Sequence, residues 1–111
     1  VLLPKNIVGC ENIPELLNTV DDILLVVPSK AFVEVLRLLK PHLRSHQRII
    51  WATKGLEPQR GRFLHEVIEE ELGPDLKYAI LAGPSFASEV AKELPTAVTI
   101  ATNDEGFAKI Y

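Results

Sequence analysis

Three apolar segments of this chain each run without polar interruption into a tight turn, and a helical pattern follows each turn. The segments span residues 23–27, 49–53 and 78–82, and the turns are Pro28-Ser29, Lys54-Gly55 and Gly83-Pro84-Ser85. Continuous apolar runs of this length are typical of strands that are buried on both faces. We therefore predict an α/β fold whose mostly parallel sheet is connected by crossover helices.

The connecting helices are predicted from apolar residues at intervals of three and four. Such spacing covers residues 32–39, for which Ser29 is the expected N-cap, and residues 63–72, where Gly73-Pro74 ends the pattern. These two helices lie between consecutive predicted strands. We expect them to be the crossover helices that join parallel strands.

The last quarter of the chain predicts shorter elements. Ser85 is the expected cap of a short helix that continues to about Glu93, and residues 96–101 predict a fourth strand of undecided direction. Thr102 and Glu105 have the spacing of a capping box at the start of a further helix, which we expect to lack a packing partner. This helix start and the absence of methionine lead us to expect an internal piece of a longer protein.

The composition is that of a globular protein and excludes several classes. The chain has 111 residues, of which 47% are hydrophobic, and a formal net charge of −3, which argues against a general nucleic-acid binder. No apolar run approaches the roughly 20 residues that cross a bilayer. Cys10 is the single cysteine, so we expect neither an intramolecular disulfide nor a cysteine-based metal site, and predict a semi-buried side chain. His42, His46 and His65 lie in polar surroundings without converging ligands, and we predict no metal site.

Lys54 is the only lysine directly at the exit of a predicted strand, which makes it the first candidate for chemistry. Ligands of parallel α/β sheets bind beyond the carboxyl ends of the strands. An ammonium group there can hold a phosphate or form a hydrogen bond with a hydroxyl group. Gly55 allows the chain to turn sharply after it. The alternative interpretation is a solvated lysine in an ordinary turn.

The turn Gly83-Pro84-Ser85 is the second candidate. A turn that enters a helix presents free backbone N–H groups, Ser85 adds a hydroxyl group, and the helix start favours an anion. The alternative is that Ser85 only caps its own helix. Pro28-Ser29 gives a weaker signal of the same kind, because prolines are common after strands.

Four strings of residues together resemble the bacterial NAD(P)-dependent glycerol-3-phosphate dehydrogenase family, in order and with similar spacing. They are Leu25-Val26-Val27-Pro28-Ser29, Trp51-Ala52-Thr53-Lys54-Gly55-Leu56-Glu57, Leu81-Ala82-Gly83-Pro84-Ser85-Phe86-Ala87-Ser88-Glu89 and Leu94-Pro95-Thr96-Ala97. The resemblance covers nearly the whole chain. It implies a Rossmann-like domain in a cytoplasmic enzyme that uses NAD(P)H to interconvert dihydroxyacetone phosphate and sn-glycerol 3-phosphate for phospholipid synthesis.

The resemblance also implies roles for individual residues. The implied substrate-binding residues are Lys54, Gly83 and Ser85, and the implied cofactor-binding residues are Pro28, Ser29, Lys54 and Ala87. Lys54 is thereby the candidate catalytic residue. Pro28 and Ser29 correspond more loosely, and Ser85 keeps a hydroxyl group where related proteins can carry threonine.

Two parts of the family's pattern have no counterpart in residues 1–111. These are the glycine-rich loop that holds the pyrophosphate and the C-terminal helical domain with its proton-handling lysine. The resemblance therefore implies the second half of a dinucleotide-binding domain, inactive alone, from a parent enzyme that we expect to be a homodimer. Two alternatives stay open: another reductase of this architecture acting on a different small hydroxy acid, and a non-catalytic nucleotide-binding module.

Overall fold

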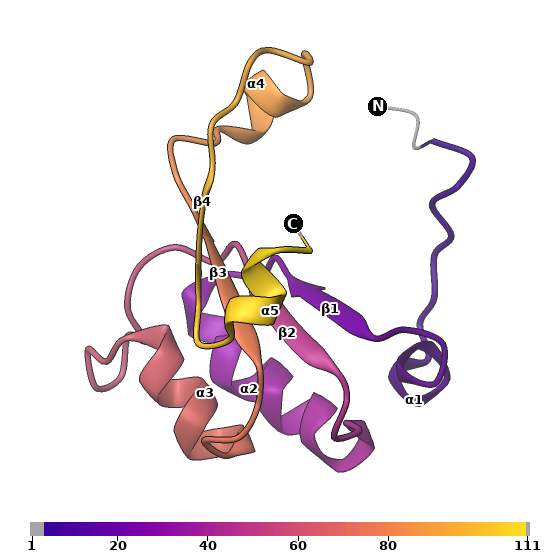
Figure 1. Cartoon of the computed structure of the whole chain (residues 1–111), viewed down its shortest axis with the longest axis vertical. Coiled ribbons are helices and arrows are strands. Elements are labelled where there is room, and N and C mark those ends of the chain that lie inside the picture. Colours follow the sequence, from indigo (N-terminus) through magenta and orange to yellow (C-terminus); the bar gives the residue numbers. More distant parts are fainter. Residues whose placement is uncertain (1–3, 111) are drawn as a thin grey trace.

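The computed structural model describes residues 4–110 as a four-stranded sheet with helices packed on it (Figure 1). The elements are α1 (Ile13–Leu17), β1 (Asp22–Leu25), α2 (Ser29–Leu39), a 3-10 turn (Lys40–His42), β2 (Arg48–Trp51), α3 (Leu64–Leu72), β3 (Tyr78–Ala82), α4 (Ala87–Val90), β4 (Thr99–Thr102) and α5 (Glu105–Ala108). The strand order is β1-β2-β3-β4, with β1, β2 and β3 parallel and β4 antiparallel to β3. The predicted α/β class with a mostly parallel sheet is confirmed.

The larger part of the core lies between the sheet and the helices α2 and α3. Trp51 at the end of β2 is 1% exposed, as the sequence predicted for a core residue. Its ring meets Phe32 of α2 edge-on at 5.9 Å and Tyr78 of β3 at 5.3 Å between ring centroids. Val67 and Ile68 bring α3 into the same cluster. Because such a core is closely packed, it fixes where β2 ends and therefore where the following residues begin.

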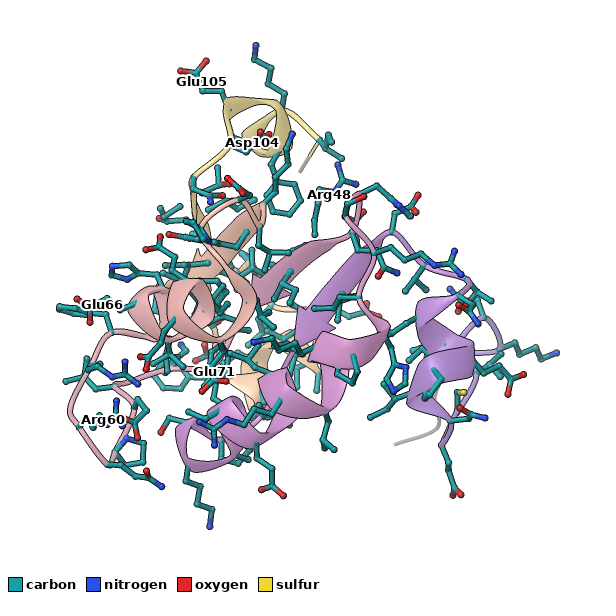
Figure 2. All side chains as sticks on the ribbon, turned by 90° about the horizontal axis from the view of Figure 1, so that it is seen from below. Arg48, Arg60, Glu66, Glu71, Asp104 and Glu105 are labelled. Carbon is teal, nitrogen blue, oxygen red and sulfur yellow. The ribbon has the colours of Figure 1, made fainter. Side chains whose placement is uncertain are left out.

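The short helix α5 covers part of the opposite face of the sheet, so the expectation that it lacks a packing partner was wrong. Phe107 is 1% exposed and packs against Ile50 and Ala79. The guanidinium group of Arg48 lies 5.1 Å from the centroid of the Phe107 ring. Figure 2 shows Arg48 beside α5, whereas Glu105 points away from the molecule. Phe107 is thus the buried side chain through which α5 packs on the sheet.

Two helix starts differ from the predicted caps. Asp104, rather than Thr102, caps α5, because its Oδ1 accepts a hydrogen bond from the N–H of Phe107 at 2.8 Å. Thr102 is instead the last residue of β4. Pro28 occupies the N-cap position of α2, so Ser29 is the first residue of that helix and not its cap. Helix ends commonly differ by one or two residues from a sequence pattern, since they depend on local backbone dihedrals.

The strand ends also differ from the apolar runs. β1 and β2 end at Leu25 and Trp51, two residues before the runs end, and β4 begins at Thr99 rather than at residue 96. The chain leaves the ladder gradually, because the N–H of Ala52 still donates to the carbonyl of Leu25 at 3.0 Å. The antiparallel direction of β4 follows from the connection that precedes it, which holds only the four-residue helix α4 and no full crossover helix.

Cys10 is exposed, so the prediction of a semi-buried side chain was wrong. Within residues 4–110 no helix has the length and apolar character needed to span a membrane. The same residues hold no group of three side chains that could bind a metal ion. His46 pairs with Asp21 at 3.2 Å.

Tyr78 ties the sheet to α3 through its hydroxyl group. This side chain is 8% exposed, and its hydroxyl donates to Oε1 of Glu69 at 2.9 Å. Burial raises the pKa of Tyr78 to about 12, and the hydrogen bond and negative charge of Glu69 act in the same direction. The folded protein therefore holds this proton to a higher pH than an unfolded chain, in which a tyrosine titrates near 10.

We predict that the free energy of unfolding falls as the pH rises from about 10 through about 12, because only the folded state keeps Tyr78 protonated there. Below about pH 10 this contribution is fully present. Ultraviolet absorbance of a Tyr111→Phe variant, which leaves Tyr78 as the one tyrosine, measures the titration directly. Glu69→Gln should lower the midpoint without returning it to 10, since burial remains. A midpoint near 10 in the parent variant would contradict the fold described here.

Candidate functional site

The exits of β2 and β3 meet at the carbonyl group of Gly83. This oxygen accepts a hydrogen bond from Nζ of Lys54 at 2.8 Å and a second one from the N–H of Ser85 at 2.9 Å. Lys54 is exposed, and Gly83 and Ser85 are half-buried. The structure therefore brings together the three residues to which the resemblance gave a role in substrate binding, although Lys54 and Gly83 are 29 residues apart in the sequence.

The backbone before Lys54 is held by the sheet and by one side chain. Trp51 ends the β2 ladder, and the hydroxyl group of Thr53 then donates to the carbonyl of Val27 at 2.7 Å. This bond ties the exit of β2 to the exit of β1. Gly55 follows with a φ of +92°, a backbone conformation that residues other than glycine rarely adopt. Thr53 was not predicted as a site residue, because a threonine at a strand end is usually explained by β propensity alone.

Gly83 is required by a close approach of two segments. Its φ is +141°, and a Cβ atom built there would lie 2.7 Å from the carbonyl oxygen of Ala97 and 3.3 Å from the Cα of Val98. The turn after β3 thus runs directly against the segment that enters β4. A glycine at this place lets the Gly83 carbonyl face Lys54.

A pocket of about 290 Å³ opens beside Lys54. Its lining includes Gly55 and Gly83 at the strand exits, and Phe63 and His65 near the start of α3. The rings of Phe63 and His65 stack with centroids 5.6 Å apart. Lys54 and His65 are the residues of this lining that can carry positive charge, and no aspartate or glutamate belongs to it. Such a pocket favours an anionic ligand.

Phe63 and His65 were not predicted as site residues, because the sequence placed them on a helix whose partner was unknown. No spacing rule links them to Lys54. Phe63 is 59% exposed, which is unusual for a large aromatic side chain and marks it only once the structure is known.

The remaining candidates lie farther from Lys54. Pro28 is exposed and Ser29 half-buried at the start of α2, beside the carbonyl of Val27 that binds Thr53. Ala87 is the first residue of α4, which stands away from the sheet (Figure 1), and residues 86–99 are all exposed. The structure therefore places the turn at Pro28-Ser29 next to the Lys54 turn but leaves Ala87 apart.

The predicted capping role of Ser85 was wrong. Phe86 occupies the N-cap position of α4, and no side chain makes a capping hydrogen bond there. The backbone N–H of Ser85 is used by Gly83, whereas its hydroxyl group has no role in starting the helix. The hydroxyl group can thus serve a ligand at this edge.

Comparisons with known proteins agree on one family. Residues 1–108 match the model of a family described as NAD-dependent glycerol-3-phosphate dehydrogenase N-terminus. The chain is 49% identical over 111 residues to a glycerol-3-phosphate dehydrogenase, NAD(P)+, of Haemophilus influenzae (strain PittEE), which is 100% of this chain and 33% of that relative. It is 53% identical over 89 residues to the same-named protein of Edwardsiella ictaluri (strain 93-146), covering 80% of this chain and 26% of that relative.

Solved structures give the same picture. A crystal structure of glycerol-3-phosphate dehydrogenase from Coxiella burnetii superimposes with a TM-score of 0.83 at 47% identity, over 89% of this chain and 30% of that chain. The glycerol-3-phosphate dehydrogenase of Plasmodium falciparum gives a TM-score of 0.86 at 28% identity, over 97% of this chain and 30% of that chain. The chain spans about a third of the length of the curated relatives it matches most fully.

We predict that Gly83→Ala destabilises the protein by about 1–3 kcal/mol, because the added methyl group meets the backbone at Ala97 in a strained conformation. Gly73→Ala is the matched control: its φ is also positive, at +99°, but nothing lies within 4 Å of the built Cβ atom. Urea unfolding of both variants measures the difference. Equal losses of unfolding free energy in the two variants would show that the backbone at Ala97 can move away without cost. The close approach at Gly83 would then not constrain the site.

Proposed function

Because the chain belongs to the family of NAD-dependent glycerol-3-phosphate dehydrogenase N-termini, we propose that it forms part of a longer dehydrogenase. That enzyme interconverts dihydroxyacetone phosphate and sn-glycerol 3-phosphate, with NAD(P)H as its cofactor. The proposal rests on one observation: at the carboxyl edge of the parallel strands, the Gly83 carbonyl accepts hydrogen bonds from both Lys54 Nζ and the Ser85 N–H. Substrates of open α/β sheets bind at this edge.

Lys54 is the residue that we assign to the reacting end of the substrate. Its ammonium group has three N–H donors, so it can keep its hydrogen bond to Gly83 and still donate to a substrate oxygen. Negative charge develops on the carbonyl oxygen of dihydroxyacetone phosphate during reduction, and a fixed cation nearby stabilises that charge. The hydroxyl group of Ser85 supplies a further polar contact from the same turn.

The residues of this chain fit one side of a dinucleotide. The helix α2 begins at the carboxyl edge of β1 without a side-chain cap, so N–H groups of its first turn are available to a phosphate. The pocket lining beside Lys54 carries no aspartate or glutamate to repel an anion. When bound, the nicotinamide cofactor supplies or accepts the hydride. Pro28, Ser29 and Lys54 would hold it from this side.

The residues that bind the pyrophosphate of the cofactor are not among those assigned above. The chain contains no Gly-x-Gly-x-x-Gly string, so the pyrophosphate must be held by other residues of the enzyme. Ala87 as a cofactor contact stays a prediction, and it requires that the cofactor reach the segment that projects from the sheet. The inactivity of the 111 residues alone also stays a prediction.

The cellular role follows from the product. We propose that the enzyme is a cytoplasmic homodimer that binds no nucleic acid and provides sn-glycerol 3-phosphate for glycerophospholipids. The net charge of −3 supports the absence of a nucleic-acid partner.

We predict that Lys54→Ala in the full-length enzyme lowers kcat/KM for dihydroxyacetone phosphate by about 100-fold or more, because it removes the cation at the reacting oxygen. Turnover falls and substrate binding weakens. Steady-state oxidation of NADPH measures both. Lys77→Ala is the matched control, since Lys77 precedes β3 at the opposite edge of the sheet and pairs with Asp104 at 2.8 Å.

Unchanged kinetics of the Lys54→Ala enzyme would remove Lys54 from the site. Equal turnover of other small ketones by the unaltered enzyme would instead favour a different reductase of the same architecture. The two outcomes separate an error in the residue from an error in the substrate.

A further inference from the structure

The segment between Lys54 and α3 is folded around a buried carboxylate. Glu57 is 3% exposed, and its two carboxylate oxygens accept the backbone N–H groups of Gln59 at 2.6 Å and Arg60 at 2.9 Å. The backbone of Glu57 also pairs across the turn: its N–H donates to the carbonyl of Arg62 at 2.9 Å, and its carbonyl accepts the N–H of Gly61 at 2.8 Å. One residue thus organises the whole turn.

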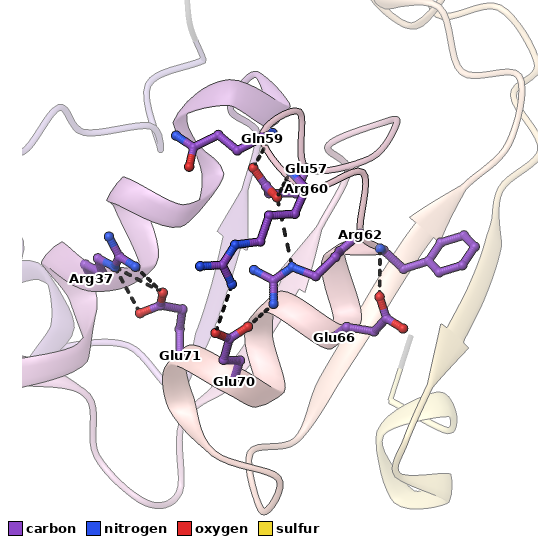
Figure 3. Close-up of polar contacts among 9 residues, drawn as sticks. Arg37, Glu57, Gln59, Arg60, Arg62, Glu66, Glu70 and Glu71 are labelled. Carbon is purple, nitrogen blue, oxygen red and sulfur yellow. Dashed lines mark hydrogen bonds and ion pairs between the residues drawn. The ribbon is translucent and has the colours of Figure 1, made fainter.

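This turn is attached to α3, and a neighbouring ion pair attaches α3 to α2 (Figure 3). Arg62 forms an ion pair with Glu70 of α3, and its Nε lies 4.0 Å from a carboxylate oxygen of Glu57. Arg60 reaches the same Glu70 at 3.6 Å. Arg37 of α2 pairs with Glu71 at 2.6 Å. The turn therefore has a fixed position against α3, which is itself tied to α2.

Glu57 ionises readily in this setting. Burial acts to raise the pKa of Glu57, but the backbone hydrogen bonds from Gln59 and Arg60, together with the charges of Arg62 and Arg60, lower it further than burial raises it. The net shift of this pKa is downward. A carboxylate that accepts two N–H groups is stabilised in its charged form.

Glu57 is also the first anchored residue after Lys54. On the N-terminal side, Lys54 is held by the β2 ladder and by the bond of Thr53 to Val27. On the C-terminal side comes Gly55, whose φ of +92° marks a sharp turn with no side chain to hold it. The backbone at Lys54 is therefore fixed from both sides only while Glu57 holds the turn.

We propose that Glu57 is a positioning residue that keeps Lys54 directed at the Gly83 turn. The catalytic part of this proposal rests on the proposed function. Glutamine is the informative replacement. Its side chain has one oxygen, which can accept one of the two backbone hydrogen bonds, and its NH2 group cannot accept the other from a backbone N–H donor. The side-chain volume stays nearly the same, so a change in kinetics reports the lost anchoring rather than a cavity.

The first test is kinetic and uses the full-length enzyme. We expect Glu57→Gln to lower kcat/KM for dihydroxyacetone phosphate by about 10- to 100-fold, as a small misplacement of a catalytic group does. In a Lys54→Ala background, Glu57→Gln should lower kcat/KM by less than about twofold, because there is no ammonium group left to misplace. Glu57→Asp, which keeps the charge, should restore part of the loss. Glu71→Gln is the matched control with unchanged kinetics, because the ion pair of Glu71 with Arg37 joins α3 to α2 and includes no residue of the turn.

The second test does not depend on activity or on the substrate. Acetic anhydride labels exposed lysines, and peptide mass spectrometry measures the rate at each one. We expect Glu57→Gln to raise the labelling rate of Lys54 about fivefold, the factor that corresponds to one lost hydrogen bond, and to leave Lys30 of α2 unchanged. Glu57→Asp allows the same comparison if the glutamine variant does not fold.

The proposal would be overturned if Glu57→Gln lowered kcat/KM by the same factor in the unaltered and the Lys54→Ala enzyme. Unchanged labelling of Lys54 would also overturn it. In either case Glu57 would contribute only to stability. Failure of the unaltered enzyme to reduce dihydroxyacetone phosphate would count against the proposed function instead. In that case the labelling rates still decide whether Glu57 positions Lys54.

Discussion

The hydrogen bond from Lys54 to the carbonyl of Gly83 joins the exits of two neighbouring strands, and the functional assignment depends on it. A single such bond contributes only about 1 kcal/mol, and a lysine side chain loses up to about 2 kcal/mol of conformational freedom when it is fixed. The bond therefore cannot hold the two strand exits together by itself, and the backbone at both ends must already be in place. Trp51 in the core fixes one end, and the close approach of Gly83 to Ala97 fixes the other.

The arrangement of charge supports an anionic ligand at this edge, although the chain as a whole is acidic. The pocket beside Lys54 has no carboxylate in its lining. Three acidic residues of α3 and of the turn before it, Glu57, Glu70 and Glu71, each pair with an arginine. The cation at the strand exits thus lies in a pocket without acidic residues, and three nearby carboxylates are paired with arginines. A phosphate-bearing substrate and a dinucleotide both fit such a distribution.

The sequence predicted the parallel sheet, the burial of Trp51 and the positions of Lys54 and the Gly83 turn at the exits of two strands. These features follow from local patterns, since apolar runs mark buried strands and parallel strands end at one edge. The packing of Phe107 and the burial of Glu57 were not predicted. The packing of Phe107 depends on Ile50 and Ala79, which lie far away in the sequence. The contacts of Glu57 are local, with residues 59–62, but a lone glutamate after a turn looks like any solvated side chain.

The most direct test of the central claim is a crystal structure of the full-length enzyme with its cofactor and dihydroxyacetone phosphate bound. We predict that Nζ of Lys54 lies about 3 Å from a substrate oxygen and that the Gly83 turn borders the same ligand. A complex in which the ammonium group of Lys54 faces solvent, with the substrate held at another edge of the sheet, would contradict it.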